Sequence, residues 1–261
     1  MLTNYNVNEI QAFNDNYIWA ITHDLSSSCV IVDPGCSDEV IDYLNQRNLT
    51  LEAILITHHH NDHIGGVKKL QQLFPNVIVY GPAKEAQNVV SVPLQEDDTV
   101  VIEKLGLSLS VLDVPGHTLG HIVYFDDESL FSGDTLFAGG CGRMFEGTPD
   151  MFSSSLNKLS KLSPATKVYC AHEYTLNNLS FAKAVEPNST ELDKRITLCE
   201  RQRDKNRPTV PSTIEQELST NPFLRLTHTD VVHSLNVEFS LSLANNSVEN
   251  FQWLRHWKDT F

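Results

Sequence analysis

The sequence predicts an α/β fold in which two β-sheets carry helices on their outer faces, followed by a smaller, mostly α-helical domain. Two observations support this prediction. In residues 1–174, short apolar runs with strand character alternate with segments of helical spacing and frequent turn residues. Residues 176–206 have helical character and lack such strand runs. We therefore place two domains at residues 1–174 and 175–261, which a chain of 261 residues can accommodate.

The strands of the first domain are expected where β-branched and aromatic residues cluster between turn residues. They are 18–21, 29–32, 53–56, 77–80, 107–112, 122–125 and 167–170. Two helices are expected among them. Val40, Ile41 and Leu44 have helical spacing within residues 38–47, and a second helix is expected at about residues 64–74.

In the second domain, Pro208 and Pro211 interrupt the helical segment. The spacing of Ser212 and Glu215 is that of a capping box, which predicts the start of another helix. Apolar residues at positions 251, 254 and 257 predict a final helix within residues 248–257.

The net charge of −14 disfavours nucleic acid and anionic membrane surfaces as partners, because both are negatively charged. The excess lies in residues 1–174, which hold nine Lys and Arg against 22 Asp and Glu, whereas residues 175–261 hold ten against eleven. Bound divalent metals would offset part of that excess. No apolar run approaches the roughly 18 residues that a membrane-spanning helix needs.

The chain has five cysteines, an odd number without a C-x-x-C pair, which favours reduced thiols over a disulfide framework. Residues 1–5 lack a basic segment followed by an apolar one, so no signal peptide is expected. Both observations predict a cytoplasmic protein.

Residues 57–63, Thr-His-His-His-Asn-Asp-His, are the most informative segment of the chain. This heptad places four candidate metal ligands at the end of an expected buried strand, namely His58, His60, Asp62 and His63. Imidazole and carboxylate groups suit zinc and similar divalent metals. A strand would put His58 and His60 on one side, and a turn into a helix would direct Asp62 and His63 elsewhere. The heptad can therefore serve two metals.

Three later segments also end an expected strand in a ligand-type residue. They are Pro115-Gly116-His117-Thr118, Ser132-Gly133-Asp134-Thr135 and Ala171-His172-Glu173. Glycine beside a ligand lets the backbone turn tightly near a metal. Each segment alone is weak evidence, because a lone histidine is usually a core or surface residue, but their joint occurrence after the heptad is far more specific.

These segments resemble those of the metallo-β-lactamase superfamily, and within it those of the hydroxyacylglutathione hydrolases, or glyoxalase II. The resemblance covers essentially the whole chain. Outside the ligand segments it rests on residues 133–137, 140–143, 210–213, 221–225, 254–255 and 258–259. It implies an αββα metallo-β-lactamase sandwich with a binuclear site at one edge, followed by a helical domain that binds the substrate.

The resemblance also implies two divalent metal ions per chain, with zinc expected first and iron or manganese as alternatives. The implied ligands are His58, His60 and His117 for one metal, Asp62, His63 and His172 for the other, and Asp134 as a bridge between them. A bridging hydroxide would be the nucleophile, oriented by Asp62 and Asp134. His121 is expected beside the site rather than in it.

The implied activity is hydrolysis of S-lactoylglutathione to glutathione and D-lactate, the second step of methylglyoxal detoxification. A monomer is expected, although the sequence does not fix the oligomeric state. A metal lowers the pKa of its bound water towards about 7, so no nucleophilic side chain is needed. A thiolate, with a pKa of about 8.5, can leave without a proton donor. The nitrogen of an amide or lactam is more basic and generally needs one.

Glutathione carries two carboxylates, so cations are expected in its site. By the resemblance, the substrate contacts are Arg143, Phe145, Tyr174, Arg255 and Lys258. Arg255 and Lys258 are three residues apart on an expected helix and therefore share a face. Many relatives have lysine in place of Arg143 and tyrosine in place of Phe145, so the affinity for glutathione thioesters is expected to differ from theirs.

Other functions fit the sequence less well. A persulfide dioxygenase of the same superfamily would use one iron and lack the long helical domain. A true β-lactamase would need export, and a nuclease would need a basic surface. A non-catalytic, metal-stabilised binding module is disfavoured because structural zinc sites are usually closed and rich in cysteine.

Overall fold

The computed structural model describes residues 5–242 and 246–261. Residues 1–4 lie outside the described residues. They belong to the N-terminal segment for which no signal peptide is expected. The chain separates into two compact units. The first comprises Met1–Asp113 and Thr118–Gly133, and the second comprises Val114–His117 and Asp134–Phe261. The domain boundary expected between residues 174 and 175 rests on the change in sequence character rather than on contacts. It therefore stays a prediction.

The first unit contains a six-stranded sheet with the order β1-β2-β3-β4-β5-β6. Its strands are β1 (Tyr5–Ala12), β2 (Asn16–His23), β3 (Ser28–Val32), β4 (Thr50–Leu55), β5 (Ile78–Pro82) and β6 (Val92–Leu94). The first three strands pair antiparallel, and β3 to β6 run parallel. The carboxyl ends of β3 and β4 therefore meet at one edge, which is where ligand sites form in parallel sheets. The ligand heptad follows β4 at this edge.

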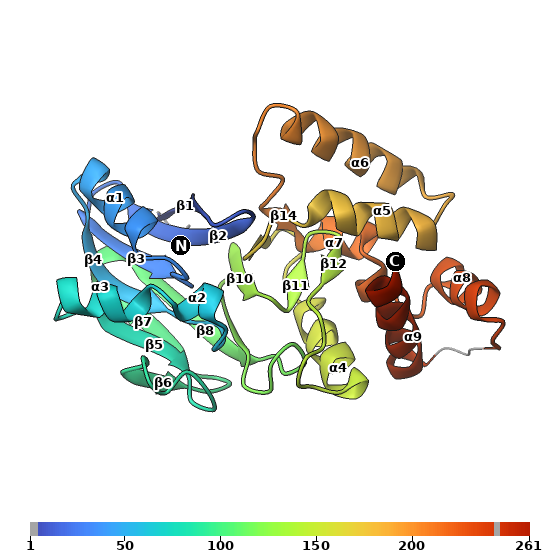
Figure 1. Cartoon of the computed structure of the whole chain (residues 1–261), viewed down its shortest axis with the longest axis horizontal. Coiled ribbons are helices and arrows are strands. Elements are labelled where there is room, and N and C mark those ends of the chain that lie inside the picture. The colour runs from blue at the N-terminus through green and yellow to red at the C-terminus, as the bar shows by residue number, and fades with distance from the viewer. Residues whose placement is uncertain (1–4, 243–245) are drawn as a thin grey trace. The chain divides into compact units, whose positions relative to one another are not determined.

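Helices α1 (Asp38–Arg47) and α3 (Val67–Leu73) cover one face of this sheet, as Figure 1 shows. Leu44 of α1 and Leu70 of α3 pack with Ile54 of β4 in one buried cluster. The alternate strand residues, such as Val30 and Leu55, are also fully buried. Both faces of the central strands are thus covered, which explains their continuous apolar runs.

A second, antiparallel set of strands follows in the same unit. It consists of β7 (Thr99–Ile102), β8 (Leu107–Asp113), β9 (Ile122–Phe125) and β10 (Ser129–Gly133), with a 3₁₀ turn η1 (Glu103–Leu105) between the first two. Tyr124 of β9 is fully buried and donates a hydrogen bond of 2.8 Å from its hydroxyl to the carbonyl of Ile56. This bond ties the second set of strands to the residue just before the heptad.

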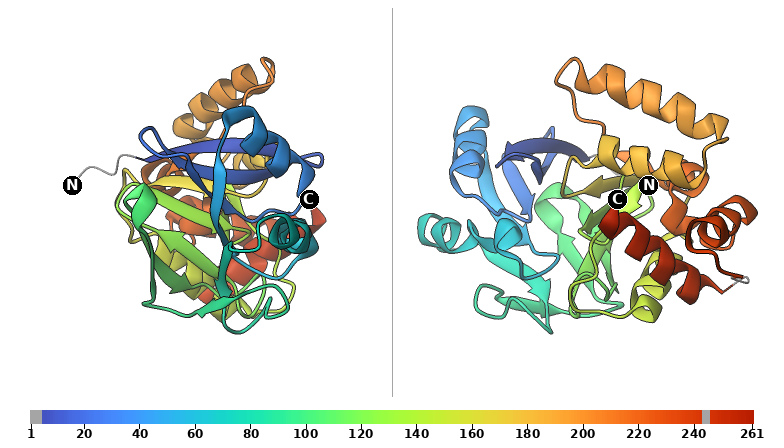
Figure 2. Two further views of the ribbon diagram at one scale, coloured as in Figure 1. Left: turned by 90° about the vertical axis from the view of Figure 1, so that its left-hand side faces the viewer. Right: turned by 45° about the vertical axis from the view of Figure 1, so that its right-hand side comes forward.

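The second unit is mostly helical. Its helices are α4 (Pro149–Leu159), α5 (Thr175–Val185), α6 (Thr190–Arg203), α7 (Ile214–Thr220), η2 (Pro222–Leu224), α8 (Thr229–Phe239) and α9 (Ser247–Thr260). Its strands are the hairpin β11 (Leu136–Phe137) and β12 (Gly140–Cys141), and the pair β13 (Lys167–Cys170) and β14 (Ser212–Thr213). Helices α5 and α6 lie side by side (Figure 2).

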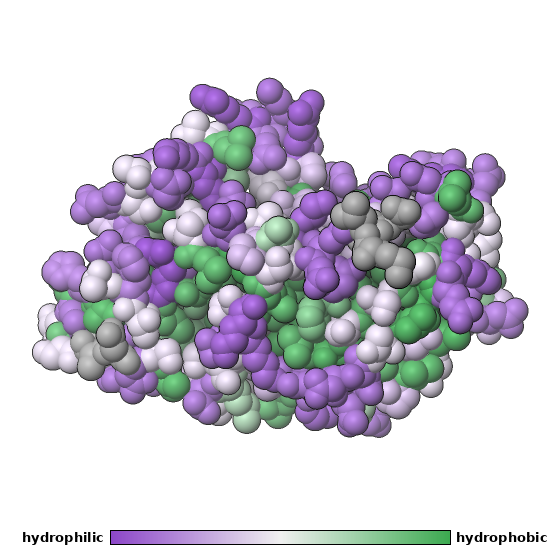
Figure 3. Space-filling view, turned by 180° about the vertical axis from the view of Figure 1, so that it is seen from behind, coloured by the Kyte–Doolittle hydropathy of each residue, from purple (hydrophilic) through white to green (hydrophobic). Residues whose placement is uncertain are grey.

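The surface carries hydrophilic and apolar side chains interspersed with one another on the face drawn in Figure 3. Among residues 5–242 and 246–261, no helix combines the length and the apolar composition required to cross a membrane.

All the expected strands and the helix at residues 38–47 are confirmed, with ends that differ by a few residues. The helix expected at residues 64–74 is instead divided into α2 (Asn61–Ile64) and α3. At the division the amide of Gly66 donates a 2.9 Å hydrogen bond to the carbonyl of Pro34 rather than to a carbonyl of α2. Glycine permits this approach, because an added Cβ would lie 2.7 Å from the backbone of Pro34, Cys36 and Ser37. The helical segment 176–206 is likewise divided into α5 and α6.

The predicted cap of the next helix is wrong by one residue. Ser212 belongs to β14, and the hydroxyl of Thr213 accepts the hydrogen bond that caps α7, from the amide of Gln216 at 3.2 Å. The sequence Thr213-x-x-Gln216 has the same capping-box spacing as Ser212-x-x-Glu215. Both residues pair with β13, and of the two it is Thr213 whose hydroxyl accepts the capping hydrogen bond. Helices α4 and α8 were not expected.

A buried polar network connects α6 and α7 to the β11–β12 hairpin. Arg195 of α6 forms an ion pair with Glu217 of α7, and their side chains are 3% and 0% exposed. Glu217 also accepts a hydrogen bond of 2.8 Å from the amide of Gly139. Asn221 donates 2.9 Å and 3.3 Å hydrogen bonds to the carbonyls of Gly140 and Phe137. The network therefore fixes the hairpin that follows Asp134.

Replacing Arg195 with alanine leaves the Glu217 carboxylate buried without its cation, which we expect to cost about 3–5 kcal/mol of unfolding free energy. Its neighbour Lys194 pairs with Glu191 at the surface, where the side chains are 72% and 58% exposed. Lys194→Ala is therefore the matched control, with an expected change of about 0–1 kcal/mol. Denaturant titration measures both values, and equal losses would contradict a structural role for the buried pair.

Candidate metal centre

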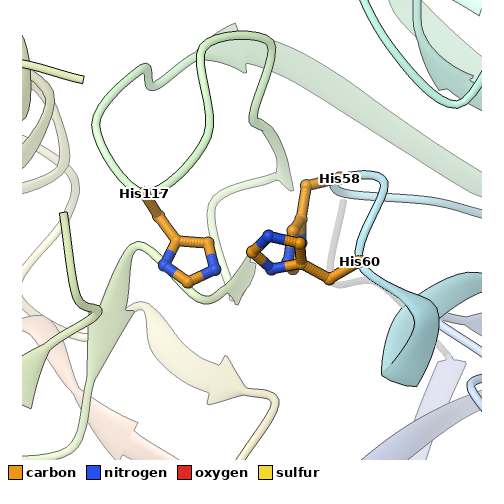
Figure 4. A group of neighbouring side chains, drawn as sticks. All are labelled: His58, His60 and His117. Atoms are coloured by element: carbon orange, nitrogen blue, oxygen red, sulfur yellow. The ribbon is translucent and has the colours of Figure 1, made fainter. Parts of the chain in front are cut away.

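The first unit brings the four heptad residues together on the loop between β4 and α2 and on α2 itself. His58 and His63 are almost completely buried. Nε2 of His58 lies 3.0 Å from Nδ1 of His60, and Nε2 of His63 lies 3.5 Å from Oδ2 of Asp62. Figure 4 shows His58 and His60 on this loop, and His117 on a loop of its own. The heptad thus offers two pairs of donor atoms.

Asp33, directly after β3, sets the orientation of ligands in both pairs. Its carboxylate accepts hydrogen bonds from the amide and the hydroxyl of Thr57, at 2.8 Å and 2.7 Å, and lies 3.0 Å from Nδ1 of His63. Since the Thr57 hydroxyl donates to Asp33, it accepts from Nδ1 of His58, at 3.1 Å. The protons of His58 and His63 are therefore held on Nδ1, which directs both Nε2 lone pairs towards a metal.

The second unit contains a group of three candidate ligands. Asp134, directly after β10, lies between two histidines: Oδ2 is 3.4 Å from Nε2 of His117, and Oδ1 is 3.4 Å from Nε2 of His172. All three side chains are buried. One carboxylate thus presents one oxygen to each histidine, which is the arrangement that a bridging ligand requires.

The segment after the hairpin orients His117. Nδ1 of His117 donates a 2.8 Å hydrogen bond to the carbonyl of Arg143, which leaves Nε2 for a metal. Gly142 makes this approach possible, because an added Cβ would lie 2.0 Å from the Asp134 carbonyl oxygen and 3.1 Å from Nδ1 of His117. His172 is held by stacking on Tyr174, with ring centroids 4.7 Å apart and planes at 5°.

The donor geometry fits divalent metals. With metal–ligand bonds of about 2.0–2.1 Å, two ligand atoms on one ion lie about 2.9–3.4 Å apart for angles between 90° and the tetrahedral value. Within each unit, the donor pairs lie 3.0, 3.5, 3.4 and 3.4 Å apart. The donors are imidazole nitrogens and carboxylate oxygens without a thiolate, a set that suits zinc, iron or manganese.

A pocket of about 650 Å³ lies entirely within the second unit. His117 and Asp134 line it, as do the five residues expected to contact the substrate: Arg143, Phe145, Tyr174, Arg255 and Lys258. The pocket therefore joins two of the predicted metal ligands to three cations.

The cations have different surroundings. Arg255 is 5% exposed, pairs with Asp259 at 2.9 Å and donates from Nη1 to the carbonyls of Cys141 and Gly142, at 3.2 Å and 3.3 Å. Lys258 donates to Asn177. Burial, together with the charge of Arg255, lowers the pKa of Lys258 to about 8. Burial raises the pKa of the Cys141 thiol, which also lines the pocket, to about 11.

Comparison with known proteins decides the family. A model described as the metallo-beta-lactamase superfamily matches residues 15–172, and one described as the hydroxyacylglutathione hydrolase C-terminus matches residues 173–261. A hydroxyacylglutathione hydrolase of Shewanella halifaxensis is 48% identical over 256 residues, covering 98% of this chain and 99% of that protein. This chain belongs to the hydroxyacylglutathione hydrolase family. A relative of the same name from Vibrio parahaemolyticus is also 48% identical, with the same coverage.

A solved structure supports the fold of this hydroxyacylglutathione hydrolase family member. ETHE1 from Myxococcus xanthus matches with a TM-score of 0.65 and 22% sequence identity, covering 97% of this chain and 99% of that one. The predicted metallo-β-lactamase fold with a C-terminal helical part is therefore confirmed.

Two residues that support the candidate ligands, Asp33 and Glu85, were not predicted from the sequence. Asp33 directly follows the strand expected at residues 29–32, and no role was expected for it. Its position at the carboxyl end of a parallel strand beside β4 was the available signal. Glu85, which contacts the heptad, has no such signal. His121, which was expected beside the site rather than in it, stacks on His58 with ring centroids 4.6 Å apart.

Replacing Asp33 with alanine should weaken metal binding by about 10- to 100-fold in both subsites, because Asp33 orients one ligand of each heptad pair. The measurement is zinc affinity by competition with a chromophoric chelator. Asp38→Ala, which removes a surface carboxylate paired with Lys69, is the control. Unchanged zinc affinity in Asp33→Ala would contradict the orienting role.

Proposed function

We propose that this chain hydrolyses S-2-hydroxyacylglutathione thioesters, such as S-lactoylglutathione, to glutathione and a 2-hydroxy acid. The observation that carries the proposal is the pocket in which His117 and Asp134 lie together with Arg143, Arg255 and Lys258. A thioester placed there would have its carboxylates among cations and its carbonyl near the ligand residues. The relatives that are 48% identical carry the name of this activity, which supports the proposal.

In the proposed site two divalent ions, zinc first among the alternatives, would be held by seven side chains. These are His58, His60 and His117 for one ion, Asp62, His63 and His172 for the other, and Asp134 for both. When bound, the ions would lower the pKa of a water molecule and polarise the thioester carbonyl. The hydrogen bonds that Nδ1 of His58, His63 and His117 donate to Thr57, Asp33 and the Arg143 carbonyl support this assignment, because they leave Nε2 of each ring as the candidate donor atom.

The residues of the pocket would bind and position the substrate. Lys258, Arg255 and Arg143 offer cations for the carboxylates of glutathione, and Tyr174 presents its ring beside His172. Because Phe145 lacks a hydroxyl, its side chain can donate no hydrogen bond to the substrate, whereas its backbone still can. The sulfur leaves as a thiolate with an ordinary pKa of about 8.5, so no general acid is required.

The remaining parts of the proposal concern the setting. We propose that the chain acts as a cytoplasmic monomer on a small-molecule thioester, without nucleic acid or membrane as partner. The net charge of −14 supports the exclusion of polyanions. A persulfide dioxygenase is the competing enzyme, and it would consume oxygen rather than release a thiol from a thioester.

Replacing Asp134 with alanine should abolish thioesterase activity and weaken metal retention, since the proposed bridge contributes to both ions. Loss of thioester absorbance with S-lactoylglutathione measures activity, and elemental analysis measures metal. Asp193→Ala, at an exposed pair with Lys183, is the control and should retain both. Near-full hydrolysis by Asp134→Ala would refute the binuclear assignment.

Lys258 should make substrate binding depend on pH. Its pKa of about 8 means that it is charged below pH 8 and increasingly neutral above it, so the KM of the wild type should rise above pH 8. Lys258→Ala should raise KM roughly tenfold near pH 7, the value of a hydrogen bond to a charged group, with a smaller change in kcat.

The matched variant is Lys258→Arg, which keeps its charge throughout this range and should remove the increase in KM above pH 8. Arg255 is a less specific test, because its guanidinium also holds the backbone of Cys141 and Gly142. A KM that is unchanged in Lys258→Ala would remove this residue from the substrate site.

A further inference from the structure

Glu85, in the turn after β5, forms a concentrated set of hydrogen bonds beside the heptad. Its side chain is only 10% exposed. Oε1 accepts hydrogen bonds from the backbone amide of His59, at 3.2 Å, and from the hydroxyl of Thr118, at 2.8 Å. Oε2 accepts from the amide of Gly120, at 3.0 Å, and lies 3.2 Å from Nδ1 of His59. One buried carboxylate thus connects two loops of the first unit.

Both loops are adjacent in the chain to proposed metal ligands. His59 lies between His58 and His60, and Thr118 follows His117 directly. We infer that Glu85 is a positioning residue for one of the two metal subsites, the one proposed to use His58, His60 and His117. The inference rests on the proposed function, because it takes the assignment of those three ligands from it.

The inference also explains the histidine in the heptad that is not a proposed ligand. His59 is half-buried and directs both its amide and its ring towards Glu85. These two contacts fix the backbone between two residues whose side chains must converge. Position 59 therefore supports the ligands on either side of it.

The effect should be confined to one subsite, because the ligands of the other are held by different residues. His63 is bonded to Asp33, and Asp62 accepts a 3.1 Å hydrogen bond from Asn16. His172 stacks on Tyr174. None of these contacts involves Glu85.

Gly120 gives independent access to the same carboxylate. A Cβ at position 120 would lie 2.8 Å from Oε2 and 2.9 Å from Cγ of Glu85, so alanine there must displace the Glu85 side chain. The φ angle of Gly120 is not positive, so alanine can adopt the backbone conformation at this position without strain. Gly120→Ala should therefore reproduce, in part, the loss of the Glu85 contacts without altering Glu85 itself.

In the test, bound metal is first removed from the chain with a chelator. Zinc is then titrated back, and isothermal calorimetry measures its binding. The wild type should bind two zinc ions. In Glu85→Ala, one of the two sites should weaken by about 10- to 100-fold, as is typical for partners of metal ligands, and the other should keep its affinity. Glu85→Gln keeps one acceptor oxygen, so its zinc affinity at the weakened site should lie between those of the wild type and Glu85→Ala.

Glu186→Gln is the control for a general loss of stability. Glu186 is a carboxylate of the second unit, 3% exposed, that forms a two-bond pair with Arg225. This variant should lower the Tm while leaving both zinc affinities unchanged. The comparison separates loss of a ligand-positioning contact from loss of a buried ion pair.

Equal weakening of both sites in Glu85→Ala, or no weakening of either, would overturn the inference while the wild type still binds two zinc ions and cleaves the thioester. A wild type that binds no metal or leaves the thioester intact would instead overturn the proposed function. If Glu85→Ala does not fold, Gly120→Ala decides the question by the same criterion.

Discussion

An imidazole can offer a metal only one nitrogen, and the hydrogen bond made by the other nitrogen determines which one it is. This constraint governs the arrangement of the candidate centre. Asp33 holds the Nδ1 proton of His63 directly and that of His58 through the hydroxyl of Thr57. The carbonyl of Arg143 does the same for His117. The surrounding backbone is folded so that these partners reach the rings.

The supporting partners come from elements that the fold fixes firmly. Asp33 ends a parallel strand beside β4, and the segment around Arg143 follows a hairpin anchored by Glu217 and Asn221. Gly142 lets that segment pass close to Asp134. The helical part of the second unit thus supports the candidate ligands His117 and Asp134 through the hairpin, in addition to supplying Lys258 to the pocket.

The sequence alone was sufficient where a signal is local. Strand runs, the helix at residues 38–47 and the heptad each depend on residues close together in the chain, so period and composition predicted them. The division at Gly65-Gly66 depends on the distant carbonyl of Pro34, which accepts the hydrogen bond of the Gly66 amide. Ser212 and Thr213 have equal capping-box spacing, so spacing alone could not identify Thr213 as the cap of α7. Glu85 meets residues 26 and 33 positions away. Contacts between residues so far apart in the chain cannot be predicted from the spacing of residues in the sequence.

The buried state of Cys141 has a consequence for the chemistry proposed for its pocket. Exchange with a disulfide requires a thiolate, and burial raises the pKa of the Cys141 thiol to about 11, which favours the protonated form at neutral pH. A pocket that discharges a thiol product beside a reactive cysteine would be exposed to blockage by the oxidised form of that product. Burial of the Cys141 sulfur, which is 5% exposed, disfavours that reaction through both the raised pKa and the restricted access.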